Sequence, residues 1–457
     1  MNKSKDKKVL IFGLGLNQGG VGSAKFFASL GAQVKVTDLK SAEILKSSLK
    51  QLKQFSNINR GTIFLQNIEY TLGEHKNEDI DWADLIIKNP SVKPGNPYIE
   101  YAHKIGKEVK MDMDIFLQNV SPSQIIGVTG TKGKSTTSSL IYELLKNMGK
   151  DVVFAGNIGT SVLDTIAFVK PNTLVVLELS SFQLESFDAS KVSPKWSIIT
   201  NITPDHLNYY SSMEEYINAK KIIGKYQTKD DFLFLRKNDP ITTIPEFLNR
   251  LQGQIIYFSK DDLPKDFLPL LKGEHNLENI AAVYQLGKAF GLDEKTLLNI
   301  LSQFKGIPFR MELIKDWNGV KIINDTAATS PEAGIKSILT FPGCILICGG
   351  MNKKMDYTKY AQTVDKCAKW VFFLEGDSSE EIKRLMKNQN LIVGTYNNLE
   401  KLLADVKSKV NLGDVVLSPQ VILFAPSATS FNLFQNEFDR GRKFNTAVDK
   451  VFGEEIP

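Results

Sequence analysis

Residues 127–137 read GVTGTKGKSTT, and this stretch decides the fold. An apolar segment at 124–128 precedes it and predicts a short buried strand, while residues 135–147 place aliphatic side chains on one face of a predicted helix. A glycine loop between a strand and a helix brings backbone N–H groups and the positive end of the helix dipole to one point. Phosphate oxygens suit that point, so the stretch indicates a site for a nucleotide triphosphate.

The same loop carries side chains suited to phosphate chemistry. Lys134 is placed to reach the β and γ phosphates, and the Ser135 hydroxyl is placed to face a magnesium ion. The usual pattern, G-x-x-x-x-G-K-[ST], has its first glycine where this chain has Val128, so the loop is a variant. The alternative is a glycine-rich turn with a surface lysine. The predicted ATP-binding residues of the loop are Gly130, Thr131, Lys132, Gly133, Lys134, Ser135 and Thr136.

Composition narrows the class of protein. The 457 residues suffice for about three domains, and 42% hydrophobic with 23% charged residues is ordinary for a soluble enzyme. The net charge of +5 is too diffuse to indicate nucleic-acid binding. We expect a cytoplasmic protein, since no signal peptide and no apolar run of roughly 18 residues is found. Cys344 and Cys348, in an apolar segment, are predicted to be core thiols; Cys367 is the third cysteine, and no C-x-x-C pair indicates a zinc ribbon.

The first hundred residues alternate apolar segments with helical ones, as in a Rossmann-like βαβ unit. A glycine-rich turn at 13–22 follows the first of these segments, and Asp38 ends the second, where such folds place a carboxylate for a ribose or base. The dinucleotide pattern G-x-G-x-x-G fails at Gln18, so NAD binding is poorly supported and a mononucleotide fold is at least as good an interpretation. The predicted strands are 9–12, 34–37, 63–65, 85–87 and 108–111.

Two further α/β patterns follow, so the chain is predicted to form three α/β domains at 1–111, 112–306 and 307–457. Continuous apolar segments favour parallel strands buried on both faces. In the second domain the predicted strands after the loop are 152–155, 174–178, 196–201, 232–235 and 255–258, with a helix at 278–290. In the third they are 320–324, 344–348, 370–374, 391–394 and 415–417.

Polar residues follow the predicted strands of the second domain, where ligands collect in open α/β sheets. Glu178 ends an apolar strand, and a carboxylate there is costly unless a cation faces it. His206, with Asp205, follows the next strand; alone it would be structural, but its place at the same edge as Lys134 favours a role in the site. For Lys220, which is followed by a second lysine, the residues alone favour an exposed helical face.

More polar groups lie downstream. Asn276 and Asn279 occur at the start of a predicted helix and suit a base or ribose, with helix capping as the alternative for Asn276. Arg310 and Asp325, in the third domain, supply a cation and an acid that could close over a triphosphate. We expect these four residues to contact ATP.

Several motifs in order resemble those of the Mur ligase superfamily, over nearly the whole chain. Besides the loop, the motifs are GNIG at 156–159, LELSSFQLE at 177–185, DH followed by Y-x-x-A-K, G-x-H-N-x-x-N, and SFNLFQNEFDRG at 430–441. The resemblance implies a Rossmann-like first domain that holds a UDP-sugar, a central P-loop ATPase-like domain, and a Rossmann-like third domain for the incoming amino acid.

The resemblance also implies the reaction. The expected enzyme is an ATP-dependent, ADP-forming ligase that adds D-glutamate to UDP-N-acetylmuramoyl-L-alanine through an acyl phosphate, in peptidoglycan synthesis. It would use ATP and two Mg²⁺ ions and act as a monomer. Lys220 matches the family's carbamylated lysine, which replaces the earlier interpretation of an exposed face. Catalytic roles would fall to Lys134, Glu178, His206 and Lys220, and metal contacts to Ser135, Glu178, His206 and Lys220.

The remaining site residues are also implied by the resemblance. The UDP-substrate would contact Gly15, Leu16, Asn17, Asp38, Asn89, Pro90, Ser91, Asn157, Ser180 and Gln183. The amino acid would contact Thr329, Lys353, Ser430 and Phe431.

The chain departs from the family pattern at two positions in the third domain. Ala327 replaces a lysine, and Phe309 replaces a histidine. Three rivals follow: a ligase of the superfamily with another amino acid or a folylpolyglutamate synthase-like enzyme, a nicotinamide-dependent oxidoreductase, and an ATP-binding protein without catalysis. The oxidoreductase leaves Lys134, Glu178 and His206 without a role.

Overall fold

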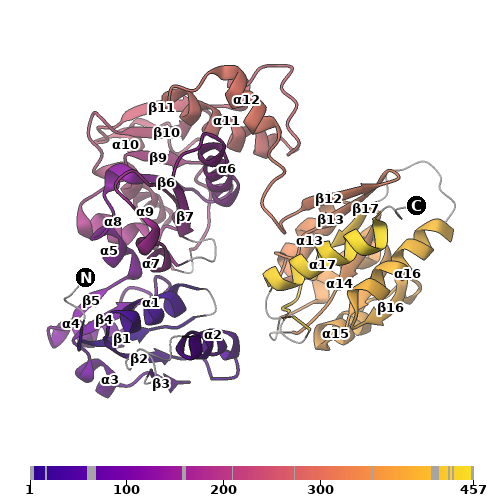
Figure 1. The fold of residues 1–457 in the computed structure, drawn as a ribbon, viewed down its shortest axis with the longest axis horizontal. Coiled ribbons are helices and arrows are strands. Elements are labelled where there is room, and N and C mark those ends of the chain that lie inside the picture. The colour runs from indigo at the N-terminus through magenta and orange to yellow at the C-terminus, as the bar shows by residue number, and fades with distance from the viewer. Residues whose placement is uncertain are drawn as a thin grey trace. The chain divides into compact units, whose positions relative to one another are not determined.

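A computed structural model describes residues 5–15, 18–58, 68–156, 161–207, 209–271, 273–352, 355–412, 421–430, 433–434 and 437–453 (Figure 1). Two compact units, Met1–Phe304 and Lys305–Pro457, make up the chain, and each is described by itself. Among the described residues, none of the helices has the length and apolar character needed to span a bilayer. The domain boundaries after residues 111 and 306 stay predictions.

The first sheet is wholly parallel and has the order β3-β2-β1-β4-β5, which confirms the Rossmann-like prediction. Its strands are β1 (Lys8–Phe12), β2 (Gln33–Asp38), β3 (Glu69–Leu72), β4 (Leu85–Lys88) and β5 (Glu108–Lys110). Helices α1 (Gln18–Ser29) and α2 (Lys46–Ile58) pack on one face, and α3 (Asn77–Trp82) and α4 (Pro97–Lys104) on the other. The predicted strand 63–65 lies outside the described residues.

The second sheet is also parallel and has the order β11-β10-β9-β6-β8-β7. Strand β6 therefore has β9 on one side and β8 on the other, so the ends of three strands meet beside the glycine loop. The strands are β6 (Ile125–Thr129), β7 (Val152–Gly156), β8 (Leu174–Glu178), β9 (Trp196–Ile199), β10 (Phe232–Arg236) and β11 (Gln254–Phe258).

Helices cover both faces of the second sheet. One face carries α6 (Lys134–Asn147), α11 (Glu274–Ala289) and α12 (Glu294–Ser302). The other carries α5 (Asp112–Leu117), α7 (Val162–Thr165), α8 (Leu184–Ser190) and α9 (Met213–Lys225), with the short α10 (Pro245–Leu248) beyond them.

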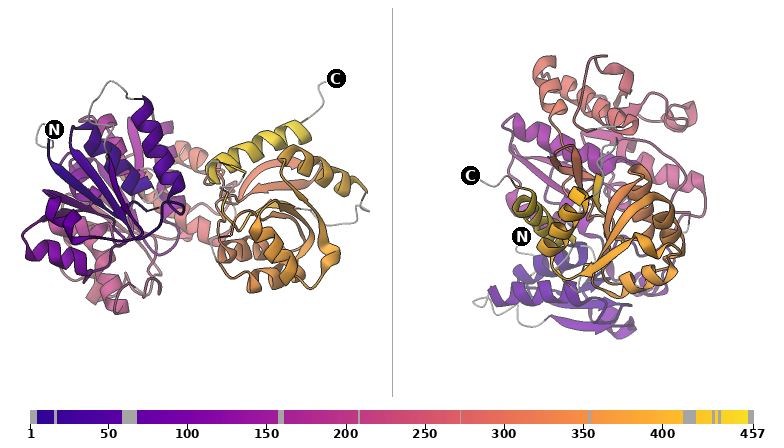
Figure 2. Two further views of the ribbon diagram at one scale, coloured as in Figure 1. Left: turned by 90° about the horizontal axis from the view of Figure 1, so that it is seen from below. Right: turned by 90° about the vertical axis from the view of Figure 1, so that its right-hand side faces the viewer.

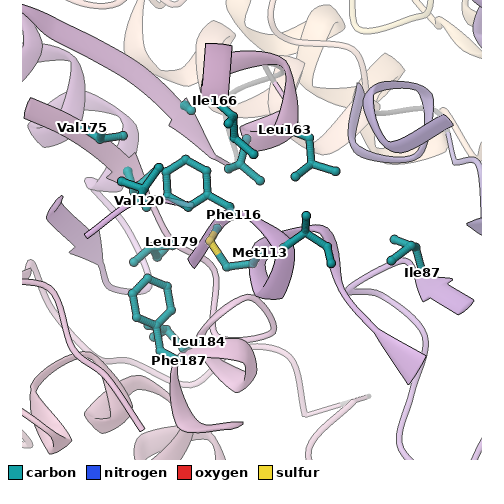
Figure 3. Close-up of a cluster of buried hydrophobic side chains, with 14 of the residues drawn as sticks. Ile87, Met113, Phe116, Val120, Leu163, Ile166, Val175, Leu179, Leu184 and Phe187 are labelled. Atoms are coloured by element: carbon teal, nitrogen blue, oxygen red, sulfur yellow. The ribbon is translucent and has the colours of Figure 1, made fainter. Parts of the chain in front are cut away.

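One apolar cluster joins the first two sheets (Figure 3). Ile87 of β4 belongs to it together with Phe116 of α5 and Leu163 of α7. Helix α1 lies so close to the start of α7 that a Cβ at Gly22 would come within 2.2 Å of the Ser161 Cβ. This close packing joins the first domain and the central domain in one compact unit.

The third sheet has the order β12-β13-β17-β14-β15-β16, with β12 and β13 antiparallel and the other pairs parallel. Figure 2 shows it from two further sides. Its strands are β12 (Glu312–Trp317), β13 (Val320–Asn324), β14 (Cys344–Cys348), β15 (Ala368–Leu374), β16 (Ile392–Tyr396) and β17 (Val421–Phe424). Helices α13 (Pro331–Thr340), α14 (Thr358–Cys367) and α15 (Asp377–Leu385) cover one face, and α16 (Leu399–Leu412) and α17 (Glu437–Phe452) the other.

The three-domain α/β prediction is confirmed, and the predictions within the third sheet hold in part. Cys344 and Cys348 are buried free thiols of β14, as expected, and Cys367 is also free. The predicted strand 415–417 lies outside the described residues. Residues 421–424, which were not predicted to form a strand, form β17, which pairs with both β13 and β14 near the middle of the sheet.

Candidate active site

The glycine loop adopts a shape that only glycine permits at two positions. Gly130 follows β6 with φ 146°, and Gly133 precedes α6 with φ 84°, both outside the range that side chains favour. A Cβ at Gly130 would lie 2.0 Å from Thr200 Oγ1, and one at Gly133 would lie 2.3 Å from Asn279 Oδ1. Neighbouring elements therefore enclose the loop, and the loop leads directly into the N-terminus of α6.

Neighbouring groups hold this loop through its backbone. The Lys132 amide donates to Asn201 Oδ1 at 3.1 Å, and Asn201 Nδ2 donates back to the Lys132 carbonyl at 2.9 Å. Lys134 Nζ donates to the carbonyls of Gly130 and Thr131, at 2.8 and 3.0 Å, so its ammonium lies over the loop. Ser135 and Thr136 follow in the first turn of α6. The predicted phosphate-binding residues thus form one compact group.

The predicted acid and imidazole lie at the same edge of the sheet. Glu178 pairs with Val128 in the β6–β8 ladder and is 2% exposed. His206 follows β9, and its half-exposed ring makes edge contacts with Phe182 at 5.1 Å and Tyr216 at 6.1 Å between ring centroids. Within the described residues, no group of three or more His, Cys, Asp or Glu side chains has the arrangement of a metal site.

Lys220 is buried beneath the loop, so the interpretation of an exposed helical face is wrong for this residue. It is 2% exposed, its Nζ donates to the Gly130 carbonyl at 2.8 Å, and the amine lies 4.8 Å from the centre of the Tyr216 ring. Burial, reinforced by the Lys134 ammonium and opposed by Asp205, lowers the pKa of Lys220 to about 7. Lys220 therefore loses its proton at a much lower pH than an exposed lysine.

Two asparagines of α11 complete the surroundings of the loop. Asn279 lies against Gly133, and its Nδ2 donates to Asn276 Oδ1 at 3.4 Å. Asn279 is buried. Asn279 therefore contacts the glycine loop from a helix that begins 141 residues after Gly133, and Asn276 lies beside Asn279 in the first turn of that helix.

Ser180 and Gln183 form a closed turn immediately after Glu178. The Ser180 amide and hydroxyl both donate to Gln183 Oε1 at 3.0 Å, which shapes the start of α8. Both residues, which were predicted to contact the UDP-substrate, therefore follow Glu178 at the edge of the sheet that carries the glycine loop. Asn157, the third, lies outside the described residues.

The first domain contains a cavity of about 460 Å³ at the carboxyl ends of β1, β2 and β4. Four predicted residues line it, whereas Pro90 lines a small neighbouring pocket and Leu16 and Asn17 lie outside the described residues. The volume suits a small ligand such as a nucleotide. The lining residues are Phe12, Gly13, Gly15, Asp38, Leu39, Lys40, His75, Asn89, Ser91, Val92, Lys93, Pro94, Gly95 and Asn96.

Asp38, the predicted carboxylate of this cavity, has a structural role. Asp38 is buried, and its two oxygens accept hydrogen bonds from the Gly15 amide at 2.9 Å and the Lys40 amide at 2.8 Å. It fixes the glycine turn after β1 against the segment after β2, and so shapes the cavity.

Sequence analysis missed His75 in the cavity wall. Its ring stacks on Phe12 with centroids 4.0 Å apart, and its Nδ1 lies 2.8 Å from Thr37 Oγ1. Burial lowers the pKa of His75, although Asp38 and Asp79 act in the opposite direction. No motif marks this residue in the sequence.

In the second unit, Asp325 anchors the segment that carries Arg310. Its carboxylate accepts hydrogen bonds from the Met311 amide at 3.1 Å and from the Ser337 hydroxyl, and burial raises its pKa. Phe309 and Met311 have left-handed backbones, with φ 67° and 46°, so Arg310 lies between two strained residues.

The structure shows what surrounds Phe309 and Ala327, the two residues that depart from the family pattern. The Phe309 ring packs over Gly441 of α17, where a Cβ would lie 2.5 Å from Phe309 Cδ1, so the aromatic ring fills space that a glycine leaves. Ala327 is exposed and donates its amide to the Phe309 carbonyl at 3.0 Å. Thr329 follows β13, and Ser430, buried, follows the adjacent β17. Lys353 and Phe431 lie outside the described residues.

Comparison with known proteins decides the family. Three family models match: Mur ligase MurD-like N-terminal domain over 7–110, Mur ligase middle domain over 128–269, and Mur ligase glutamate ligase domain over 309–418. A UDP-N-acetylmuramoylalanine–D-glutamate ligase of Roseiflexus is 32% identical over 97% of this chain and 98% of its own. A relative of the same name from Borreliella afzelii is 33% identical over 99% of both chains. The chain belongs to the Mur ligase family.

Solved structures agree with this Mur ligase in fold. UDP-N-acetylmuramate-alanine ligase from Thermotoga maritima matches with a TM-score of 0.54 and 22% identity, over 97% of this chain and 99% of that one. Membership removes the oxidoreductase as an interpretation of the glycine turn at 13–22.

Proposed function

We propose that this Mur ligase joins D-glutamate to UDP-N-acetylmuramoyl-L-alanine with hydrolysis of ATP to ADP, in peptidoglycan synthesis. Its full-length relatives carry that name, and the model that matches its third domain describes a glutamate ligase domain. The observation that carries the mechanism is the buried amine of Lys220, 2.8 Å from the Gly130 carbonyl, within a phosphate-type loop. A cytoplasmic location stays a prediction.

The reaction requires activation of a carboxylate, because a carboxylate does not react with an amine at neutral pH. The alanyl carboxylate attacks the γ-phosphorus of ATP, ADP leaves, and the glutamate amine then displaces phosphate from the acyl phosphate. Charge spreads over the phosphoryl oxygens during transfer, so positioning and cationic stabilisation supply most of the catalysis. Loop amides at 130–136 would bind the phosphates, and Lys134 Nζ would exchange its two loop carbonyls for phosphate oxygens.

The residues at the loop fit Mg²⁺. The Ser135 hydroxyl and the buried Glu178 carboxylate are oxygen donors of the kind this ion prefers, and it commonly uses one or two carboxylates together with substrate phosphates. Bound Mg²⁺ would neutralise phosphate charge. His206 is the third proposed group, and its ring is directed by Phe182 and Tyr216.

We infer that Lys220 is carbamylated in the active enzyme. Only a neutral amine reacts with carbon dioxide, and the lowered pKa of Lys220 supplies one near pH 7. The product is an anion, which would remove the repulsion between Lys220 and Lys134 and add an oxygen donor to the site.

The other predicted contacts complete the proposal. The first-domain cavity would take the uridine diphosphate, with Asn89 and Ser91 in its wall, and Ser180 and Gln183 the muramoyl end. Asn276, Asn279 and Arg310 would contact ATP, and Asp325 would act by holding Met311 and Ser337. The glutamate carboxylates would be bound by Thr329 and Ser430 together with Lys353 and Phe431.

The acceptor amino acid is tested by a direct assay. Protein, ATP, Mg²⁺ and UDP-N-acetylmuramoyl-L-alanine are mixed with a panel that includes D-glutamate, L-glutamate, D-aspartate and L-lysine, and phosphate release is followed. We expect release only with D-glutamate. Phosphate release with only a different amino acid would show that this amino acid is the acceptor. If no amino acid caused phosphate release, the ligase activity would be refuted.

His75 provides a test of the cavity. We expect His75→Leu to raise the KM for the UDP-substrate about tenfold while kcat and the KM for ATP change little, because the ring lines the cavity and lies in another domain from the loop. Since burial lowers the pKa of His75, the ring is neutral at pH 7 and this KM should be flat from pH 7 to 8. His103→Gln, at an exposed position of α4, is the control. An unchanged KM in His75→Leu would place the nucleotide elsewhere.

A further inference from the structure

Helix α8 and the segment after β9, both in the central domain, contact residues 88–92 of the first domain, which border or line its cavity. Lys88, the last residue of β4, has its Nζ 3.5 Å from Glu185 Oε2 in the first turn of α8. The other oxygen, Glu185 Oε1, accepts a hydrogen bond from the Tyr209 hydroxyl at 3.1 Å. That hydroxyl also lies 3.5 Å from the Val92 carbonyl. We call Lys88, Glu185 and Tyr209 the bridging triad.

Both ends of the bridging triad lie next to functional residues. Lys88 and Val92 flank the segment 89–91, and Asn89, Ser91 and Val92 line the cavity of the first domain. On the other side, Glu185 follows Gln183 by two residues, and Tyr209 follows His206 by three. The triad therefore spans from the nucleotide cavity to loops that begin at the ends of β8 and β9.

The bridging triad also shares an aromatic neighbour with His206. The Phe182 ring lies 4.3 Å from the Tyr209 ring and 5.1 Å from the His206 ring, between centroids. A displacement of the Tyr209 ring would thus displace the His206 ring through the Phe182 ring that packs against both. Burial, with the Glu185 carboxylate, raises the pKa of Tyr209, so the hydroxyl keeps its proton and remains a donor across the working pH range.

The junction around the triad can transmit a displacement. Lys88 and Glu185 side chains are partly enclosed, at 19% and 32% exposure, so their attraction is less screened than that of a fully exposed pair. Ile87 and Leu184, the residues before Lys88 and Glu185, belong to the apolar cluster that joins the two domains (Figure 3). A polar link thus sits directly beside a packed interface.

We infer that Glu185 is a positioning residue that couples occupancy of the first-domain cavity to the placement of the His206 loop. When the UDP-substrate orders the segment 89–92, Lys88 and the Val92 carbonyl fix the positions of Glu185 and Tyr209. These two residues in turn hold Phe182 and His206 at the edge of the sheet that carries the glycine loop. This coupling rests on the proposed function, because it presumes that the cavity takes the nucleotide.

Amide hydrogen exchange measures the coupling without turnover. In the wild-type protein, addition of the UDP-substrate alone is expected to slow exchange in the segment 203–210 as well as in 85–96. In Glu185→Ala, binding measured by calorimetry should persist and 85–96 should still be protected, while the protection of 203–210 is lost. Equal protection of 203–210 in wild type and variant would overturn the inference. No protection of 85–96 in the wild type would instead count against the proposed nucleotide site.

Kinetics provide the second readout. Glu185→Ala should lower kcat/KM for the UDP-substrate about tenfold with an unchanged KM for ATP. Asp188→Asn is the matched control, since Asp188 lies on the same helix and pairs with Lys225 within the central domain at 2.6 Å. The exchanged pair Lys88→Glu with Glu185→Lys should recover part of the loss that each change causes alone. Wild-type kinetics in Glu185→Ala, or a double variant no better than either single one, would contradict the coupling.

Discussion

Replacement of Lys220 by alanine is expected to lower kcat by at least about a thousandfold, the largest effect of any substitution considered for this Mur ligase. The amine is buried against the Gly130 carbonyl and lies 4.8 Å from the centre of the Tyr216 ring. Alanine cannot form the carbamate, so the site loses the carbamate oxygens and no other group replaces them. Initial rates of phosphate release measure the loss. Lys221→Ala is the matched control, because Lys221 is the next residue of α9 and its Nζ donates to the Glu246 and Asn249 carbonyls, at 3.3 and 2.8 Å, instead of to the glycine loop.

The pH dependence of Lys220 has a definite sign. Because its pKa is lowered to about 7, the neutral amine grows as pH rises through 7, so activation by bicarbonate at limiting carbon dioxide should increase from pH 6 to 8. Lys220→Ala should show no response to bicarbonate, and short carboxylic acids should restore part of its activity. If Lys220→Ala kept the wild-type rate, the carbamate would be refuted.

Replacement of Lys134 by alanine is expected to cost about 10² to 10³ in kcat, since one preorganised cation facing the transferred phosphoryl group is removed. Lys134 Nζ already lies over the loop, 2.8 Å from the Gly130 carbonyl, and needs little movement to reach a phosphate. Single-turnover acyl phosphate formation measures the step directly. Lys146→Ala, in the last turn of the same helix, tests whether loss of any α6 cation has the effect.

A full rate in Lys134→Ala would show that the amides of the loop bind and activate the phosphates without a cation. A raised KM for ATP with an unchanged kcat would restrict Lys134 to ground-state binding. Either result would contradict its proposed role in the transfer step.

Much of the fold followed from continuous apolar segments. The predicted strands 174–178, 320–324 and 344–348 coincide with β8, β13 and β14, because parallel strands buried on both faces carry a strong local signal. β12 was missed since it is an antiparallel edge strand in which half of the six residues are charged, which breaks the continuous apolar pattern. The four residues of β17 were too short a segment to be separated from the sequence before them.

The site residues that belong to local sequence motifs could be predicted. The residues that reach the site only through tertiary packing could not. The glycine loop and His206 follow strands and Glu178 ends one, and the strand order brings these strand ends together. The burial of Lys220 depends on how α9 lies beneath the loop, which helical periodicity cannot reveal. His75 reaches the cavity through an isolated bridge between Asp38 and Glu74, a long-range pairing with no motif.

The enclosure of the glycine loop has a consequence for biosynthesis. Its backbone is held by Asn201, and Gly133 faces Asn279, so groups about 70 and 146 residues further along the chain complete its shape. Contacts of such separation form late, after the intervening segments have collapsed. On the ribosome the loop would emerge early yet acquire its final form only when α11 docks, which makes ATP binding a property of the whole central domain.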